Sequence, residues 1–245
     1  MIKLVDLTMQ FGKRTVLQHI NMEIQQGETM VIIGPSGAGK STILKLLTGL
    51  ARPSGGQVWI DGKEISLLPE AELDEVRLNI GMVFQYSALF DSMSVGDNVA
   101  FGLRQHTTLS EAEIGEIVAE RLAGVGLSGM ENALPNELSG GMKKRVGLAR
   151  ALAFKPSIIL YDEPTSGLDP IMSRKIDNLI IETQKRYGVT SVVVTHDMES
   201  AYRIADRIAV LYEGEFAAIG TPEEIRTSKH PYVQEFVQAA SYRKE

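Results

Sequence analysis

The sequence predicts an α/β protein in which helices cover a mainly parallel sheet, and three observations support that prediction. Short aliphatic and β-branched runs alternate with segments of helical periodicity. A glycine-rich loop stands directly between one of these runs and the helical segment that follows it. The composition, with 44% hydrophobic and 23% charged residues over 245 positions, is that of an ordinary folded domain.

The N-terminal third of the sequence is predicted to form several strands and one helix. Strands are expected at residues 2–10, 16–24, 29–33, 57–60, 63–65 and 80–84. Asp61 and Gly62 stand between the fourth and fifth of these, where an Asp-Gly pair accepts the positive φ of a tight hairpin turn. The helix is expected over residues 41–50, directly after the glycine-rich loop.

The middle of the chain, residues 92–154, is predicted to be mostly helical. Ser110 and Glu113 form a capping-box pattern ahead of an amphipathic run within it. Since strands resume after it, this region reads as a helical subdomain inserted into a single domain over residues 1–245.

The C-terminal part returns to alternating elements. Strands are expected at residues 158–161, 191–195, 206–212 and 216–219. A short helix is expected to begin at Thr221 and Pro222, and a short amphipathic helix over residues 230–237.

Bulk properties exclude several classes of function. The formal net charge of −6 makes the whole chain a poor electrostatic match for nucleic acid, so no nucleic-acid partner is predicted. The absence of cysteine excludes disulfides and cysteine-ligated zinc. No apolar run approaches the roughly 18 residues of a membrane span, and residues 1–6 lack the layout of a signal peptide. If the protein works at a membrane, a separate chain would have to span the bilayer.

The glycine-rich loop carries the most specific motif. It fits the pattern G-x-x-x-x-G-K-[ST] in full, with Gly34, Pro35, Ser36, Gly37, Ala38, Gly39, Lys40, Ser41 and Thr42. Glycines let successive backbone N–H groups point at an anion, and the helix N-terminus that follows also favours phosphate. We expect Lys40 to contact the β and γ phosphates of a nucleotide and Ser41 to contact Mg²⁺.

An acidic pair ends the apolar strand at residues 158–161. Ligands of doubly wound sheets lie beyond the carboxyl ends of their strands, where Asp162 and Glu163 stand. We expect Asp162 to hold Mg²⁺ and Glu163 to orient or deprotonate the attacking water. The alternative, a polar strand end that turns at Pro164, is weakened by the phosphate loop.

A second potential phosphate-binding helix start lies at residues 138–142, which read LSGGM. Ser139 is a good N-cap, and Gly140 and Gly141 would expose N–H groups to an anion. On its own, the segment is better explained by a capped helix without a ligand.

With these three elements in order, the sequence resembles the ATPase subunits of ABC transporters over almost its whole length. Residues 34–42 match the Walker A loop, residues 158–163 match Walker B with its catalytic glutamate, and residues 138–142 match the LSGGQ signature. The resemblance implies a P-loop NTPase core with an N-terminal antiparallel β region, ATP and Mg²⁺ as cofactors, and ATP hydrolysis coupled to transport.

The same resemblance gives roles to four further residues. Gln85 matches the Q-loop glutamine that touches Mg²⁺ and the water site, and Asp169 belongs to the D-loop. His196 matches the switch histidine at the γ-phosphate, and Phe11 matches the aromatic residue that stacks on adenine. Taken singly, Phe11 reads as a core aromatic and His196 as a structural histidine.

The resemblance also implies head-to-tail dimers, in which each ATP lies between the Walker A loop of one copy and Ser139, Gly140 and Gly141 of the other. The intact motifs favour a homodimer. Met142 stands where the family usually has glutamine, which puts the contact of that side chain in doubt.

Residues 88–93, ALFDSM, and 139–145, SGGMKKR, look most like the ATPases of Mla/Mce-type lipid transporters. This implies transmembrane permease subunits, a lipid-binding Mce-type subunit, and a peripheral place on the cytoplasmic face of the inner membrane. The alternatives are an importer ATPase for a small polar solute such as an amino acid, and a soluble ABC ATPase outside transport. The second lacks the insertions or zinc modules usual for such proteins.

Overall fold

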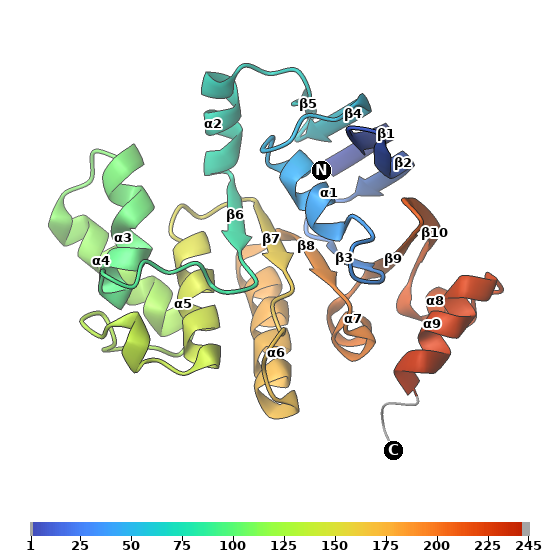
Figure 1. The fold of residues 1–245 in the computed structure, drawn as a ribbon. Coiled ribbons are helices and arrows are strands. Elements are labelled where there is room, and N and C mark those ends of the chain that lie inside the picture. The colour runs from blue at the N-terminus through green and yellow to red at the C-terminus, as the bar shows by residue number, and fades with distance from the viewer. Residues whose placement is uncertain (1, 242–245) are drawn as a thin grey trace.

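The computed structural model describes residues 2–241 and contains two β-sheets with helices packed around them (Figure 1). The larger sheet has the order β10-β9-β3-β8-β7-β6, and all neighbours in it are parallel except the β9–β10 pair. Its strands are β3 (Thr29–Ile33), β6 (Ile80–Val83), β7 (Ile158–Asp162), β8 (Thr190–Thr195), β9 (Arg207–Tyr212) and β10 (Glu215–Gly220). The mainly parallel sheet of the sequence prediction is confirmed.

The smaller sheet is antiparallel and comes from the N-terminal part of the chain. Its order is β2-β1-β4-β5, with β1 (Ile2–Phe11), β2 (Arg14–Ile24), β4 (Gly55–Ile60) and β5 (Lys63–Glu64). The β1–β2 register shifts by one residue at Asp6 in β1 and again at His19 in β2, and both residues have positive φ. Asp6 Oδ1 lies 2.7 Å from His19 Nδ1, so the two bulges hold each other.

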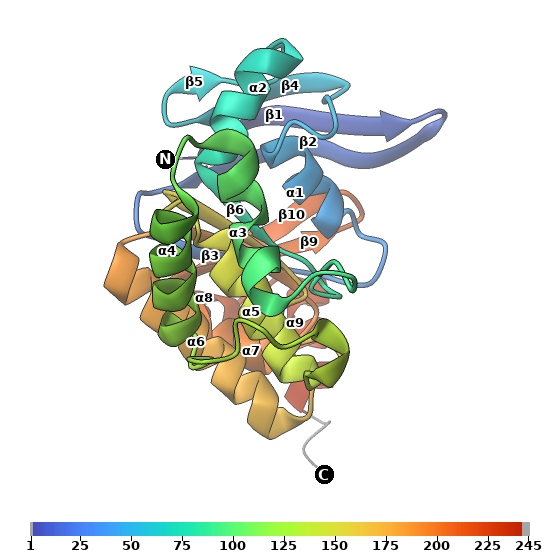
Figure 2. The same cartoon turned by 90° about the vertical axis from the view of Figure 1, so that its left-hand side faces the viewer.

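Helix α1 (Lys40–Leu47) packs against both sheets, since it contacts β4 on one side and β7 and β8 on the other. Helices α3 (Val95–His106), α4 (Glu111–Gly124) and α5 (Gly140–Ala151) pack on one another, and α5 also contacts β6. Figure 2 shows these three helices in front of the large sheet. The remaining helices are α6 (Pro170–Tyr187), α7 (Met198–Ile204), α8 (Pro222–Arg226) and α9 (Pro231–Ser241).

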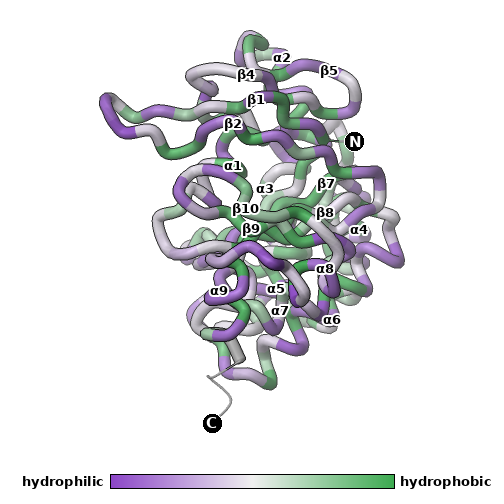
Figure 3. The backbone as a smooth tube through the Cα atoms, turned by 90° about the vertical axis from the view of Figure 1, so that its right-hand side faces the viewer, coloured by the Kyte–Doolittle hydropathy of each residue, from purple (hydrophilic) through white to green (hydrophobic). Residues whose placement is uncertain are grey.

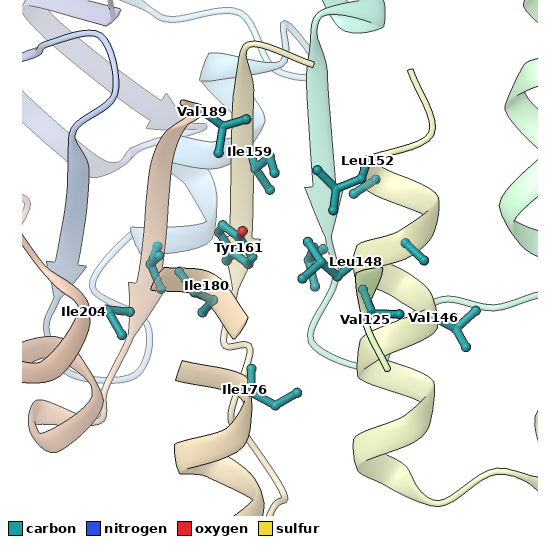
Figure 4. Packing of buried hydrophobic residues seen from close by; sticks show 14 of the residues in the cluster. Val125, Val146, Leu148, Leu152, Ile159, Tyr161, Ile176, Ile180, Val189 and Ile204 are labelled. Atoms are coloured by element: carbon teal, nitrogen blue, oxygen red, sulfur yellow. The ribbon is translucent and has the colours of Figure 1, made fainter. Parts of the chain in front are cut away.

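The two faces of the large sheet belong to two hydrophobic clusters because successive side chains of a strand point to opposite faces. In β7, Ile159 and Tyr161 join the cluster under α3 to α7, whereas Ile158 and Leu160 join the cluster around α1 and the small sheet. Figure 4 shows Ile159 and Tyr161 among side chains of the first cluster, and Figure 3 shows the apolar strands lying inside a more polar surface. The helices of residues 92–154 thus share a hydrophobic core with the large sheet. That these helices form a separate subdomain stays a prediction.

Three details differ from the sequence prediction. Helix α2 (Glu70–Leu78) is not predicted from the sequence, because only Leu73 of its nine residues is buried and its hydrophobic periodicity is weak. Helix α1 ends at Leu47 rather than residue 50, since Gly49 takes a φ of 64° that stops a helix. Between α4 and α5 the chain is mostly irregular, apart from a 3₁₀ turn at Pro135–Glu137. Across the described residues, no helix has the length and apolar character that a bilayer crossing requires.

Candidate active site

The glycine-rich loop emerges from the carboxyl end of β3, whose five residues are all buried. Gly34 passes so close to the neighbouring strand β9 that a Cβ there would lie 2.3 Å from the carbonyl oxygen of Leu211. Gly37 and Gly39 have φ values of 81° and 107°, which other residues rarely adopt. Glycine is therefore required at these points for the loop to curl into the start of α1.

Lys40 is the first residue of α1 and its ammonium group lies inside the curl of the loop. Nζ donates to the carbonyl oxygens of Gly34 at 2.8 Å and Pro35 at 3.1 Å, and it lies 3.8 Å from Glu163 Oε1. Burial lowers the pKa of Lys40, while the carboxylates of Glu163 and Asp162 act in the opposite direction. The loop thus presents a desolvated cation close to the acidic pair.

Ser41 and Asp162 come together from α1 and the end of β7. Ser41 Oγ donates to Asp162 Oδ1 at 3.1 Å. Burial raises the pKa of Asp162, and the hydrogen bond from Ser41 opposes that shift. A hydroxyl and one carboxylate are oxygen ligands that Mg²⁺ accepts when phosphates and water complete its shell. The Ser41 hydroxyl and the Asp162 carboxylate therefore fit a phosphate-bound Mg²⁺.

Glu163 follows directly and lies at the meeting point of β7 and β8. Its N–H donates to the carbonyl oxygen of Val194 at 2.9 Å. Its Oε2 accepts a hydrogen bond from Thr195 Oγ1 at 3.2 Å and lies 2.9 Å from His196 Nδ1. The Glu163 side chain is 12% exposed and that of His196 is 51% exposed. The carboxylate is thus fixed on one side while His196 faces solvent.

Gln85 and Asp169 lie in the segments that border this acidic pair. Gln85 Nε2 donates to Ser166 Oγ at 3.3 Å, which joins the segment after β6 to the loop after β7. Asp169 Oδ1 accepts the N–H groups of Ile171 at 2.9 Å and Met172 at 3.0 Å, so its carboxylate caps α6. A contact of either side chain with nucleotide or metal stays a prediction.

Phe11 lies at the tip of the β1–β2 hairpin and is 53% exposed. The alternative interpretation of Phe11 as a core aromatic is therefore wrong. The strand that follows the tip packs against the phosphate loop, where a Cβ on Gly39 would lie 2.9 Å from Leu17 Cδ2. The hairpin thus borders the loop, and stacking of Phe11 on adenine stays a prediction.

The signature segment starts α5 as the sequence predicts. Ser139 is the N-cap, and its Oγ accepts the N–H of Met142 at 3.3 Å. Gly140 and Gly141 form the first turn, and a Cβ on Gly141 would lie 2.3 Å from Met172 Cε in α6. Figure 1 shows α5 well apart from α1, so a single chain does not bring this segment to the phosphate loop.

Two residues at the site were not predicted. Thr195 donates a hydrogen bond to the Glu163 carboxylate as described above, and Lys144 of α5 is buried with its Nζ 3.3 Å from the carbonyl oxygen of Glu163. A threonine at a strand end and a lysine within a basic stretch carry no distinguishing signal in one sequence. Only the fold brings them to Glu163.

The sequence is similar to a family model and to proteins whose names describe transport ATPases or lipids. The family model described as ABC transporter matches residues 17–166. The chloroplastic protein TRIGALACTOSYLDIACYLGLYCEROL 3 of Arabidopsis thaliana is 44% identical over 96% of this chain and 73% of its own length. The intermembrane phospholipid transport system ATP-binding protein MlaF of Haemophilus influenzae is 41% identical over 98% of this chain and 91% of its own length.

Solved structures give the same fold. A dimeric post-hydrolysis state of the ATP-binding cassette MJ0796, bound to ADP and Pi, superposes with a TM-score of 0.82 at 36% identity and covers 91% of this chain and 99% of its own. cbiO1 from Clostridium perfringens, part of the ABC transporter complex cbiONQ, gives a TM-score of 0.86 at 32% identity and covers 100% of this chain and 98% of its own. With its phosphate loop, acidic pair and signature segment, the chain belongs to the ABC transporter ATP-binding family and is an ATPase subunit of that family.

Proposed function

We propose that the chain binds Mg·ATP between the phosphate loop of one copy and the signature segment of a second, and powers lipid transport through separate membrane subunits. The proposal that the transported substrate is a lipid rests on the match to MlaF, which extends over 98% of this chain and 91% of that protein. The Arabidopsis relative, which bears the name of a glycolipid, supports the same substrate class.

The chemistry follows from the geometry of the acidic pair. Lys40 and the N–H groups of the loop bind the terminal phosphates, and Ser41 with Asp162 hold the magnesium ion. When bound, Mg²⁺ neutralises charge on the phosphates and orients them. Glu163 orients the attacking water and accepts its proton, while Thr195 and His196 fix the carboxylate in place.

Membrane subunits are proposed to dock beside Gln85. The segment after it carries exposed aromatic rings, with Tyr86 86% exposed and Phe90 43% exposed. Exposed aromatic residues in one short segment favour a protein interface. The proposed partners are permease subunits and a lipid-binding Mce-type subunit, and the proposed location is the cytoplasmic face of the inner membrane.

Reconstitution tests the lipid function directly. The chain would be assembled with its membrane subunits in proteoliposomes, and ATP-dependent movement of a fluorescent phospholipid to acceptor vesicles would be measured. We expect transfer that requires Mg·ATP and is lost in a complex that carries Glu163→Gln. Robust ATP hydrolysis without any lipid transfer in either direction would contradict the lipid assignment and leave the ATPase assignment intact.

An importer function is the second candidate because one relative points to it. The Fe(3+) ions import ATP-binding protein FbpC of Escherichia coli is 42% identical over 91% of this chain, but this match spans only 63% of FbpC. In the same proteoliposomes, ATPase activity stimulated by a solute and its binding protein, with no response to phospholipid, would favour this candidate.

A further inference from the structure

Helix α5 packs directly against the segment that follows Gln85. A Cβ on Gly147 of α5 would lie 3.7 Å from the carbonyl oxygen of Ser87, and Ser87 is only 3% exposed. Ser87 and Ala88 have φ values of 64° and 46°, in the left-handed region that non-glycine residues rarely occupy. Such a backbone is strained and persists only where the surrounding structure holds it.

Two cations of α5 hold this strained segment through its carbonyl oxygens. Arg150 donates from Nη1 to Ala88 at 2.6 Å and from Nη2 to Ser87 at 2.8 Å. Lys144, one and a half turns earlier, donates from Nζ to the carbonyl oxygen of Gln85. The segment after β6 is therefore fastened to the signature helix by side chains rather than by a backbone ladder.

Lys144 differs from Arg150 because it also reaches the catalytic residue. Its Nζ lies 3.3 Å from the carbonyl oxygen of Glu163, whose φ of 46° is again left-handed. Lys144 is 5% exposed, and a buried ammonium group is costly unless acceptors satisfy it. One cation thus bridges two strained segments, which follow the neighbouring strands β6 and β7.

We propose that Lys144 is a positioning residue for ATP hydrolysis, which sets the backbone of Glu163 relative to Gln85 and the signature helix. A shift of the segment after Gln85 then reaches the Glu163 backbone through the Lys144 side chain. Lys144 touches neither nucleotide nor metal in this role. The proposal rests on the ATPase activity of the family and is independent of the substrate transported.

The experiment compares Lys144→Met with Lys143→Met in the full-length chain. Methionine keeps the length of the side chain and removes its donors. Lys143 is the neighbouring lysine on the same helix, and its side chain makes no hydrogen bond to the described residues 2–241. Steady-state ATPase kinetics and hydrogen exchange of residues 85–88 would be measured for both. We expect kcat to fall about tenfold in Lys144→Met with KM within about twofold, because only positioning is lost. Exchange at residues 85–88 should rise in Lys144→Met and not in Lys143→Met.

A third variant separates the two contacts of Lys144. Arg150→Met frees the carbonyl groups of Ser87 and Ala88 but leaves Glu163 held, so its kcat should fall less than that of Lys144→Met. Equal losses in these two variants, or a kcat of Lys144→Met equal to that of Lys143→Met, would overturn the proposal. So would lost activity without any change in exchange. Should Lys144→Met not fold, Lys144→Gln takes its place under the same criteria.

Discussion

Glu163 combines a strained backbone with a restrained carboxylate. Its positive φ turns the chain sharply after β7, and its N–H and Oε2 both bind the end of β8, through Val194 and Thr195. Strain at a reacting residue is held by its neighbours and keeps the group in one orientation. The position of the carboxylate therefore depends on two strands as well as on its own side chain.

At the same scale, Lys40→Ala should weaken binding of ATP itself. The variant removes a buried cation from the curl of the loop, and charge-assisted hydrogen bonds contribute about 1.5–3 kcal/mol each, or roughly tenfold to a hundredfold in affinity. Isothermal titration with Mg·ATP measures the change. Lys45→Ala, on the exposed side of the same helix, should bind like the parent. Unchanged affinity in Lys40→Ala would refute the assignment of the phosphate loop.

Among the elements, α6 and α7 are joined by a buried carboxylate. Asp177 of α6 is fully buried and accepts hydrogen bonds from Ser200 Oγ at 3.1 Å and Arg203 Nη1 at 2.5 Å in α7. Ser200 also contacts Asp197, which caps α7 directly after His196. The helix that begins after Asp169 is thus tied to the helix that begins after His196 and Asp197.

This contact predicts a pH dependence of stability. Burial raises the pKa of Asp177 above its ordinary value of 3.8, while Ser200 and Arg203 oppose the shift. A raised pKa means that the folded state binds the Asp177 proton more tightly than the unfolded state does. Protonation of Asp177 therefore contributes fully to the free energy of unfolding below pH 3.8, and this contribution is lost as the pH rises through the folded pKa. The free energy of unfolding of the parent should fall relative to that of Asp177→Asn from about pH 4 to about pH 7. Urea unfolding at both pH values checks this, and a constant difference between the two proteins would contradict it.

Helix α4 offers a prediction about local stability. The capping box expected at Ser110 and Glu113 is formed in both directions. Ser110→Ala removes an acceptor for an N-terminal N–H group, at about 1 kcal/mol, which corresponds to roughly 2–4 °C in the unfolding temperature of a chain of this size. Calorimetry measures the unfolding temperature, and the control variant is Thr108→Ala, which lies in the exposed loop before α4. An equal unfolding temperature in both variants would show that the cap contributes nothing.

The same elements show how far the sequence predicts the fold and the site. Motifs of adjacent residues, such as the phosphate loop, the end of β7 and the caps at Ser110 and Ser139, were predictable because local sequence decides them. Helix α2 was missed because it buries a single leucine and so has little hydrophobic periodicity. Lys144 was missed because its role depends on Gln85 and Glu163, which lie 59 and 19 residues away. Contacts of that kind come from packing and leave no local pattern.

In the whole molecule, the two helix starts that are proposed to bind phosphate belong to different regions. The phosphate loop begins α1 between the two sheets, whereas Ser139 begins α5 in the group of helices beside β6 (Figure 1). A nucleotide on the loop therefore needs a second copy to meet a signature segment. This agrees with the dimeric cassette MJ0796, to which the chain is similar.

The arrangement predicts a dimer that depends on ATP. Glu163→Gln should bind Mg·ATP without turnover and elute at twice the monomer mass, because bound ATP favours the closed pair and is not consumed. Size-exclusion chromatography with light scattering measures the mass with and without Mg·ATP. Glu116→Gln, an exposed substitution on α4, should hydrolyse ATP and show no lasting dimer. A monomer of Glu163→Gln that retains bound ATP would argue against the shared site.

The paired bulges at Asp6 and His19 have a consequence for behaviour at high concentration. β2 is the outer strand of its sheet, and a straight outer strand offers a row of free backbone groups on which another molecule could extend the sheet. The bulge at His19 interrupts that row, and the N–H of Gln18 is already bound to the carbonyl oxygen of Gly214 in the turn between β9 and β10. The kinked β2 strand is therefore a poor template for the addition of a further strand.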